Sequence, residues 1–103
     1  METLNIAVIS GNISQPARVV DVPGSGECCL FSVVTYKMTK TGDTKVRFRE
    51  EIPVAMYRPG TIAKYLTKGK PVVVQGRIAP DTEGVSNLIA SSVTFPGSKS
   101  NDE

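Results

Sequence analysis

The sequence TIAKYLTKGKPVVVQGRI, residues 61–78, predicts a short helix that leads directly into a buried strand. Thr61 is a residue type that caps helix N-termini, and apolar side chains follow it at helical spacing. Gly69 suits the position just after a helix, so we expect the helix to span residues 61–68. The continuous apolar run after the proline predicts a strand over residues 71–78.

Further extended segments are expected on both sides of this unit. Residues 4–13, with a bend or bulge at Gly11, and residues 17–22 form the first, interrupted strand. The other expected strands are residues 28–38, 45–56 and 87–95, with turns at residues 23–26 and 41–43 and a polar loop at residues 79–86. Five strands with one short helix between the third and the fourth is the order of a five-stranded OB-fold barrel, an all-β fold.

The length of 103 residues allows one domain and a small core. We expect the domain to cover residues 1–95 and a flexible polar tail to cover residues 96–103. A hydrophobic fraction of 40% and a charged fraction of 21% are ordinary for a globular protein. The net charge of +2 permits a nucleic-acid partner without requiring one.

The residue types that catalysis and metal binding need are scarce in this chain. It has no histidine, and its two cysteines, Cys28 and Cys29, are adjacent, a position that disfavours a disulfide between them. We expect them to pack as small apolar side chains. Glu50 and Glu51 are neighbours on an expected strand, so their carboxylates point to opposite faces. The sequence therefore predicts a protein that is not an enzyme and that needs no cofactor or metal.

The first residues, Met1 to Ile6, lack the features of a signal peptide, and no apolar run is long enough to span a membrane. Together with unpaired cysteines, this predicts a cytoplasmic protein with no membrane partner.

Several stretches of the chain resemble the bacterial single-stranded DNA-binding proteins. They are residues 5–13 with the Gly11-Asn12 pair, followed by Pro16; Phe31-Ser32-Val33; and residues 62–78, where Tyr65-Leu66-x-Lys68-Gly69 leads to Val74-Gln75-Gly76-Arg77. The resemblance covers residues 4–95. It implies an OB-fold that binds single-stranded DNA without sequence preference in replication, recombination or repair, with replication or recombination proteins as candidate partners. The related primosomal replication proteins, which Ile52-Pro53-Val54 resembles, stay a second possibility.

Binding to single strands needs a basic surface for phosphates and aromatic rings on which bases stack. Lysine and arginine alternate along residues 45–49, which places them on one face of a strand. With the tyrosines and basic residues nearby, they form the predicted nucleic-acid-binding set: Arg18, Tyr36, Lys37, Lys40, Lys45, Arg47, Arg49, Tyr57 and Arg77.

The chain departs from the family in having no tryptophan. Phe48 alternates with the arginines, so we expect it in the core. The scarcity of aromatic residues favours an alternative function, a protein-interaction OB module with weak affinity for nucleic acid. Ile6, Val8 and Ile9 put apolar side chains on both faces of the first strand, from which we expect a homodimer or homotetramer.

Overall fold

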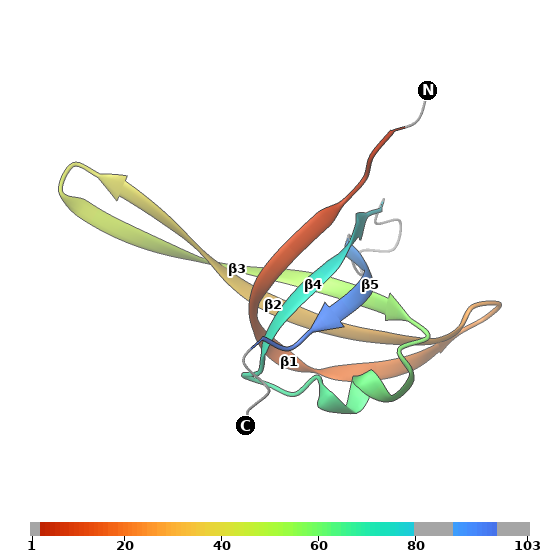
Figure 1. Cartoon of the computed structure of the whole chain (residues 1–103). Coiled ribbons are helices and arrows are strands. Elements are labelled where there is room, and N and C mark those ends of the chain that lie inside the picture. Colours follow the sequence, from red (N-terminus) through yellow and green to blue (C-terminus); the bar gives the residue numbers. More distant parts are fainter. Residues whose placement is uncertain (1–2, 80–87, 97–103) are drawn as a thin grey trace.

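The computed structural model describes residues 3–79 and 88–96 and contains five strands and one short helix in these residues (Figure 1). The elements are β1 (Ala7–Val22), β2 (Gly26–Thr41), β3 (Thr44–Tyr57), η1 (Gly60–Tyr65), β4 (Pro71–Ile78) and β5 (Leu88–Thr94). The strands close into a barrel in the order β1-β2-β3-β5-β4. The prediction of an all-β, five-stranded OB-fold barrel with one short helix between the third and fourth strands is confirmed.

The first strand is continuous, although the sequence predicted two pieces. β1 runs through Pro16 and pairs first with β4 and then with β2. Its irregularities are two register shifts against β2, between Ile13 and Gln15 and between Gln15 and Arg18. The expected bend at Gly11 is therefore wrong in position, because Gly11 pairs with Val72 in regular register. The shifts follow from Pro16, which has no N–H to give to the ladder.

Gly11 and Gly76 are needed for a different reason, the close approach of neighbouring strands. A Cβ atom at Gly11 would collide with the carbonyl oxygen of Val34, and one at Gly76 would collide with that of Ile89. Only glycine lets these backbones come so near each other.

The helix is shorter than predicted and is a 3₁₀-helix. It spans Gly60–Tyr65, its N-cap is Pro59, and no side chain caps it, so the expected cap at Thr61 and the end near Lys68 are both wrong. Leu66 ends the helix and points into the core, where it is 1% exposed. Burial of the Leu66 side chain at the end of the barrel, and not helix propensity, therefore decides where this helix ends.

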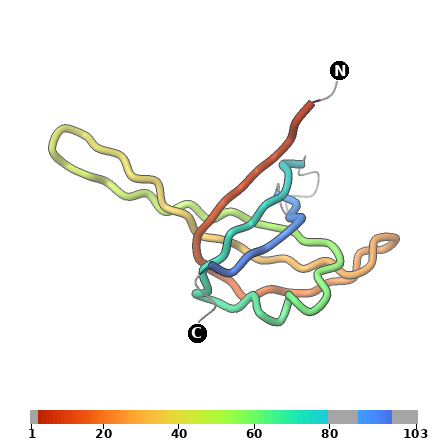
Figure 2. Tube along the Cα trace, viewed as in Figure 1, coloured from red at the N-terminus to blue at the C-terminus, as the bar shows by residue number. Residues whose placement is uncertain are grey.

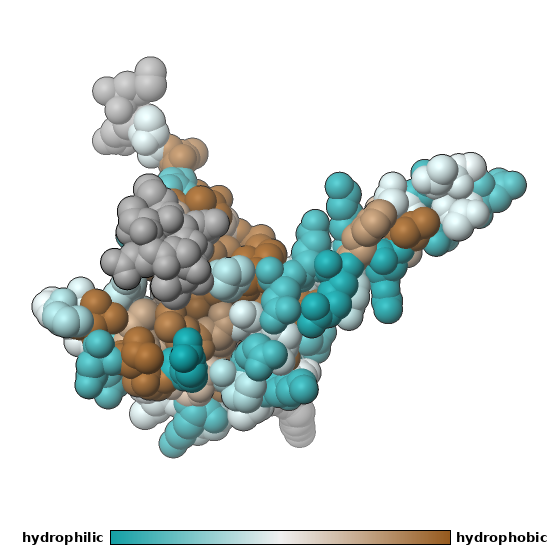
Figure 3. Space-filling view, turned by 180° about the vertical axis from the view of Figure 1, so that it is seen from behind, coloured by the Kyte–Doolittle hydropathy of each residue, from teal (hydrophilic) through white to brown (hydrophobic). Residues whose placement is uncertain are grey.

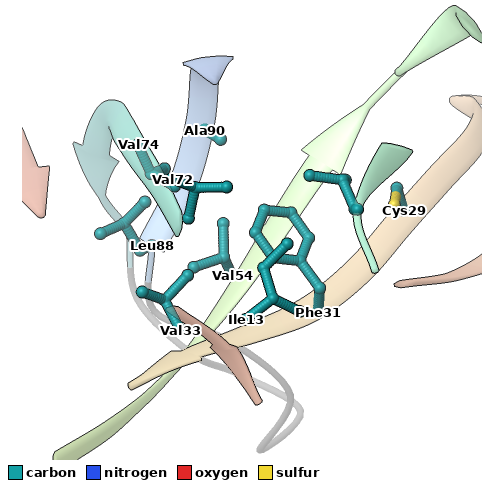
Figure 4. Packing of buried hydrophobic residues seen from close by; sticks show 10 residues of the cluster. Ile13, Cys29, Phe31, Val33, Val54, Val72, Val74, Leu88 and Ala90 are labelled. Atoms are coloured by element: carbon teal, nitrogen blue, oxygen red, sulfur yellow. The ribbon is translucent and has the colours of Figure 1, made fainter. Parts of the chain in front are cut away.

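The core lies inside the barrel and is built from side chains of all five strands and Leu66. Figure 4 shows Ile13, Phe31, Val33, Val54 and Val72 directed toward one another. Partly buried side chains such as Ile9 and Met56 pack against this cluster. Ile9 faces inward, whereas Val8 on the opposite face of β1 and Ile6, just before the strand, are exposed.

The strands β2 and β3 continue beyond the barrel as a two-stranded arm, residues 35–50 (Figures 1 and 2). The pairing of β1 with β2 ends at Asn12 and Val34, and the pairing of β3 with β5 involves Val54 and Ala55. The Cα radius of gyration is 15.4 Å, against about 13 Å for a compact domain of 100 residues. Gly42, with a positive φ of 63°, sits in the two-residue turn at the tip of the arm.

Two sequence-based predictions fall on residues outside the described part of the chain. These are most of the polar loop at residues 79–86 and most of the tail at residues 96–103, so the division into a domain and a tail stays a prediction. Within residues 3–79 and 88–96, no helix has the length and apolar character to cross a membrane.

Candidate nucleic-acid interface

One face of the arm collects most of the predicted binding residues. The register of β2 and β3 pairs Tyr36 with Arg49, Met38 with Arg47, and Lys40 with Lys45. Residues directly opposite each other in an antiparallel pair point to the same side. The sequence predicted the alternation along β3, and the register adds Tyr36 and Lys40 from β2. We call this the basic face, which consists of Tyr36, Met38, Lys40, Lys45, Arg47 and Arg49.

The ring of Tyr36 is already in contact with one of the arginines. The guanidinium carbon of Arg47 lies 4.4 Å from the ring centre, in the diagonal position across the two strands. Tyr36 is nevertheless 50% exposed. A half-exposed ring beside fixed positive charge offers a base a surface for stacking and its phosphate a partner.

A hollow of about 360 Å³ lies where the basic face meets the barrel. Tyr36 and Arg49 line it from the arm, and Lys68 and Gly69 line it from the turn that follows η1. Lys68 was not among the predicted binding residues, because only the fold brings this turn beside the arm. The hollow thus combines one ring with two cations from separate elements.

The turn that carries Lys68 is held firmly on β1. The amide N–H of Gly69 donates to the carbonyl oxygen of Ile13 (2.7 Å), and the N–H of Ile13 donates to the carbonyl of Lys70 (3.0 Å). The side chain of Asn12 donates to the carbonyl of Gly69 (3.0 Å). The Gly-Asn pair thus has two separate tasks: Gly11 allows close strand packing, and Asn12 fixes the turn that presents Lys68.

A carboxylate, Glu51, lies at the root of the arm. It accepts hydrogen bonds from the hydroxyl of Ser14 on β1 and from Nη1 of Arg49, the latter at 3.4 Å. The hydrogen bond from Ser14 is the largest effect on the pKa of Glu51 and lowers it; burial opposes this, and the charge and hydrogen bond of Arg49 lower the pKa further, so that it lies below its ordinary value. Glu51 is therefore ionised at neutral pH and ties the arm to β1 across β2.

Two further hollows lie along the barrel part of the same ribbon. One, of about 460 Å³, is lined by Arg18 together with Leu30, Ser32 and Pro53. It lies where β1 shifts register against β2, so the shift opens the space beside Arg18. Arg18 lies within β1, in the part of the first strand that the sequence predicted as residues 17–22.

The other hollow, of about 330 Å³, is lined by Ser25, Tyr57 and Arg58. Tyr57 is 43% exposed and ends β3, eight residues from Arg49, which is roughly 26 Å along a strand. Arg58 has a positive φ of 54°, and its N–H donates to the carbonyl of Glu27. The structure therefore places Tyr57 near a cation, but far from the basic face.

Two predicted residues lie away from this surface. Lys37 pairs with Phe48 on the opposite face of the arm. Arg77 lies within β4, paired with Ile89 of β5, and so belongs to the barrel and not to the arm. The expectation that Phe48 belongs to the core is wrong, because its side chain is 51% exposed. Phe48 lies on the same face of β3 as the core residue Val54, but the arm extends beyond the barrel, so no interior covers the Phe48 ring.

Comparison with known proteins agrees with this geometry. The chain is 31% identical over 80 residues to a single-stranded DNA-binding protein of Treponema pallidum (strain Nichols), a match over 76% of this chain and 46% of that relative. The sequence resemblance to single-stranded DNA-binding proteins thus extends over about three quarters of this chain. The chain spans less than half the length of this relative. No family model matches the chain.

Two solved structures of single-stranded DNA-binding proteins share the fold. A Plasmodium falciparum protein, solved in complex with single-stranded DNA, superposes with a TM-score of 0.78 at 19% identity, over 92% of this chain and 96% of its own. A small single-stranded DNA-binding protein of Streptomyces coelicolor gives a TM-score of 0.72 at 19% identity, over 96% of this chain and all of its own. At these identities the two neighbours establish the barrel and its topology.

The two cysteines have a structural role. Cys28 and Cys29 are buried and unbridged, as predicted, and burial raises the pKa of both thiols. A raised pKa keeps a thiol protonated and unreactive. In the described part of the chain, no three residues of the types His, Cys, Asp and Glu come together in a way that could hold a metal ion.

Proposed function

We propose that this protein binds single-stranded DNA without sequence preference, through the basic face of the arm and the hollow at its root. In this proposal the phosphates contact Arg47, Arg49 and Lys68, and a base stacks on Tyr36. Binding of this kind would serve replication, recombination or repair, wherever single strands are exposed.

The observation that carries the proposal is the cross-strand register of the arm. It brings four cations and one tyrosine onto one face of a ribbon that projects into solvent. Figure 3 displays the arm projecting from the body, with hydrophilic side chains along much of it and hydrophobic ones between them. Such a face can follow a phosphate backbone, and its interleaved apolar and aromatic groups can meet the bases.

The test is a salt titration of oligo-dT binding by the wild type and by Arg47→Glu with Arg49→Glu. We expect the wild type to bind at low salt and its affinity to fall steeply as salt rises. For single strands, each lost phosphate contact reduces the slope of log K against log salt by about 0.7. The double variant should therefore bind at least tenfold more weakly, with a slope shallower by about 1.4.

Lys37→Glu, compared with Arg47→Glu alone, gives a control of equal charge change on the same arm. Lys37 pairs with Phe48 on the face that points away from Tyr36. Arg47→Glu should cost clearly more affinity than Lys37→Glu. Equal losses would mean that net charge, and not the basic face, governs binding. No wild-type binding at low salt would favour the protein-interaction module instead.

Self-association is the second part of the proposed function. Leu4, Ile6 and Val8 are 89%, 65% and 59% exposed, and they lie on the outward face of β1 and the residues before it. A second copy packed on this face would remove the exposed apolar side chains from water. Light scattering should give a mass of at least twice 11 kDa, and Ile6→Glu with Val8→Glu should return the 11 kDa monomer.

A further inference from the structure

A second basic and aromatic cluster lies at the end of the barrel beside η1, outside the predicted binding set. The Nζ atom of Lys70 lies 4.8 Å from the ring centre of Phe95 and 5.6 Å from that of Tyr65. The Nζ atom of Lys64 lies 5.3 Å from the same Tyr65 ring. We call these four residues, Lys64, Tyr65, Lys70 and Phe95, the end cluster.

The rings hold the two ammonium groups in place. Each contact lies within the 6 Å range of a cation–π interaction, and Lys70 contacts two rings, one from η1 and one from the residue after β5. A lysine in water loses rotamer entropy when it binds a ligand, and a lysine already held on a ring loses less. Tyr65 is 48% exposed and Lys64 is also exposed, whereas Lys70 and Phe95 are half-buried, so the cluster faces solvent mainly through Lys64 and Tyr65.

The end cluster lies close along the chain to the hollow at the root of the arm. Lys68 lines the hollow beside Tyr36 and Arg49, and Lys70 is two residues further along the same turn, at most about 7 Å away along the backbone. Hydrogen bonds from Gly69 and Ile13 fix this turn on β1. A polyanion that leaves the hollow over Lys68 therefore meets Lys70 and Lys64 next.

We propose that the end cluster is a second contact site for the phosphates of the same single strand, so that DNA turns from the arm around the η1 end of the barrel. The proposal rests on the proposed function and extends it. Short oligonucleotides occupy the basic face and the hollow alone, while longer ones also reach Lys64 and Lys70.

The test is binding of a length series of oligo-dT, from 5 to 30 nucleotides, to the wild type and two double variants. Lys64→Gln with Lys70→Gln removes two ammonium groups from the end cluster. Arg47→Gln with Arg49→Gln removes the same charge from the basic face. The Lys64/Lys70 variant should match the wild type on the shortest oligonucleotides that bind. It should be roughly 20-fold weaker on the longest at 0.1 M salt, since two phosphate contacts contribute a slope of about −1.4.

The arginine variant should lose affinity at every length. If Lys64→Gln with Lys70→Gln follows the wild type at every length, the second site is refuted while the proposed function stands. If that variant loses affinity equally at every length, the cluster is part of one short site and the proposed turn of the strand is wrong. If the arginine variant binds like the wild type, the proposed function itself fails.

Lys70→Arg separates binding from folding. Arginine keeps the positive charge and stacks on aromatic rings as lysine does. This variant should keep the affinity of the wild type for the longest oligonucleotide. Weak binding by a Lys70→Arg protein that melts at the wild-type temperature would show that the charge at position 70 does not contact phosphate, and would overturn the proposal.

Discussion

The strands β2 and β3 contribute both to the barrel and to the arm. The two regions differ in what covers the face of these strands that points to the barrel interior. In the barrel, Val33 and Val54 are at most 1% exposed because β1 and β5 flank the ribbon and close the structure around them. Further along β3, Phe48 lies on the same face of the ribbon as Val54 but is 51% exposed. All three side chains are apolar, and what differs is the structure that surrounds them.

This difference assigns separate tasks to the two regions. The barrel gains its free energy of folding from buried apolar area. The arm is a two-stranded ribbon, and such ribbons are only marginally stable by themselves. Its side chains are therefore free to serve binding, and changes there should affect affinity rather than stability.

The largest expected contrast is between Leu66→Ala in the barrel and Met38→Ala in the arm. Leu66 is 1% exposed and Met38 is 59% exposed. Removing the Leu66 side chain should cost about 2–5 kcal/mol of unfolding free energy, since it leaves a cavity in the core. Met38→Ala should stay within about 0.5 kcal/mol of the wild type. Urea denaturation measures both, and a comparable loss for Met38→Ala would contradict the division of tasks.

A second contrast concerns glycines. Gly11→Ala should cost about 1–3 kcal/mol, because the new Cβ meets the carbonyl of Val34 and the strands must separate. At the tip of the arm, a Cβ at Gly42 would meet no other atom within 4 Å. The only cost of a side chain there is the positive φ of the backbone. Gly42→Asn should therefore cost less, since asparagine tolerates this conformation. Thermal melts of the two variants should rank in that order.

A third contrast compares tyrosines in binding. If a base stacks on Tyr36, Tyr36→Ala should weaken oligo-dT binding by about 1–2 kcal/mol, and Tyr36→Phe should keep most of the affinity. Tyr57→Ala should cost less on short oligonucleotides, because Tyr57 lies far along the ribbon from the basic face. An unchanged affinity for Tyr36→Ala, with steep salt dependence, would assign binding to phosphate contacts alone.

The smallest effect concerns the junction between barrel and arm. The pKa of Glu51 is lower in the folded protein than its ordinary value of 4.5, so the unfolded chain binds this proton more tightly. Its stabilising contribution is present above pH 4.5 and is lost as pH falls through the lower, folded pKa. Denaturation from pH 7 to pH 3 should give a slightly steeper loss for the wild type than for Glu51→Gln. Identical profiles would remove Glu51 as a tie between the two regions.

Much of the fold could be predicted from the sequence, because it depends on local patterns. The glycine-bounded strands, the apolar run Val72-Val73-Val74 and the position of the short helix gave the element order, and that order is nearly specific to an OB-fold. The errors came where long-range contacts prevail over propensity. Pro16 lies inside β1 because pairing on both sides of the shift holds it there. The helix ends at Leu66 because the core needs that side chain.

Only part of the candidate site could be predicted from the sequence. Alternation along β3 placed Lys45, Arg47 and Arg49 on one face, because strand geometry has a fixed period of two. The partners of these residues depend on the register and on closure of the barrel. The register and the closure of the barrel decided that Lys37 faces away, that Lys68 lines the hollow from a distant turn, and that Lys70 contacts both Tyr65 and Phe95. The sequence by itself determined which chemistry is present, and the tertiary structure alone decided which groups share a surface.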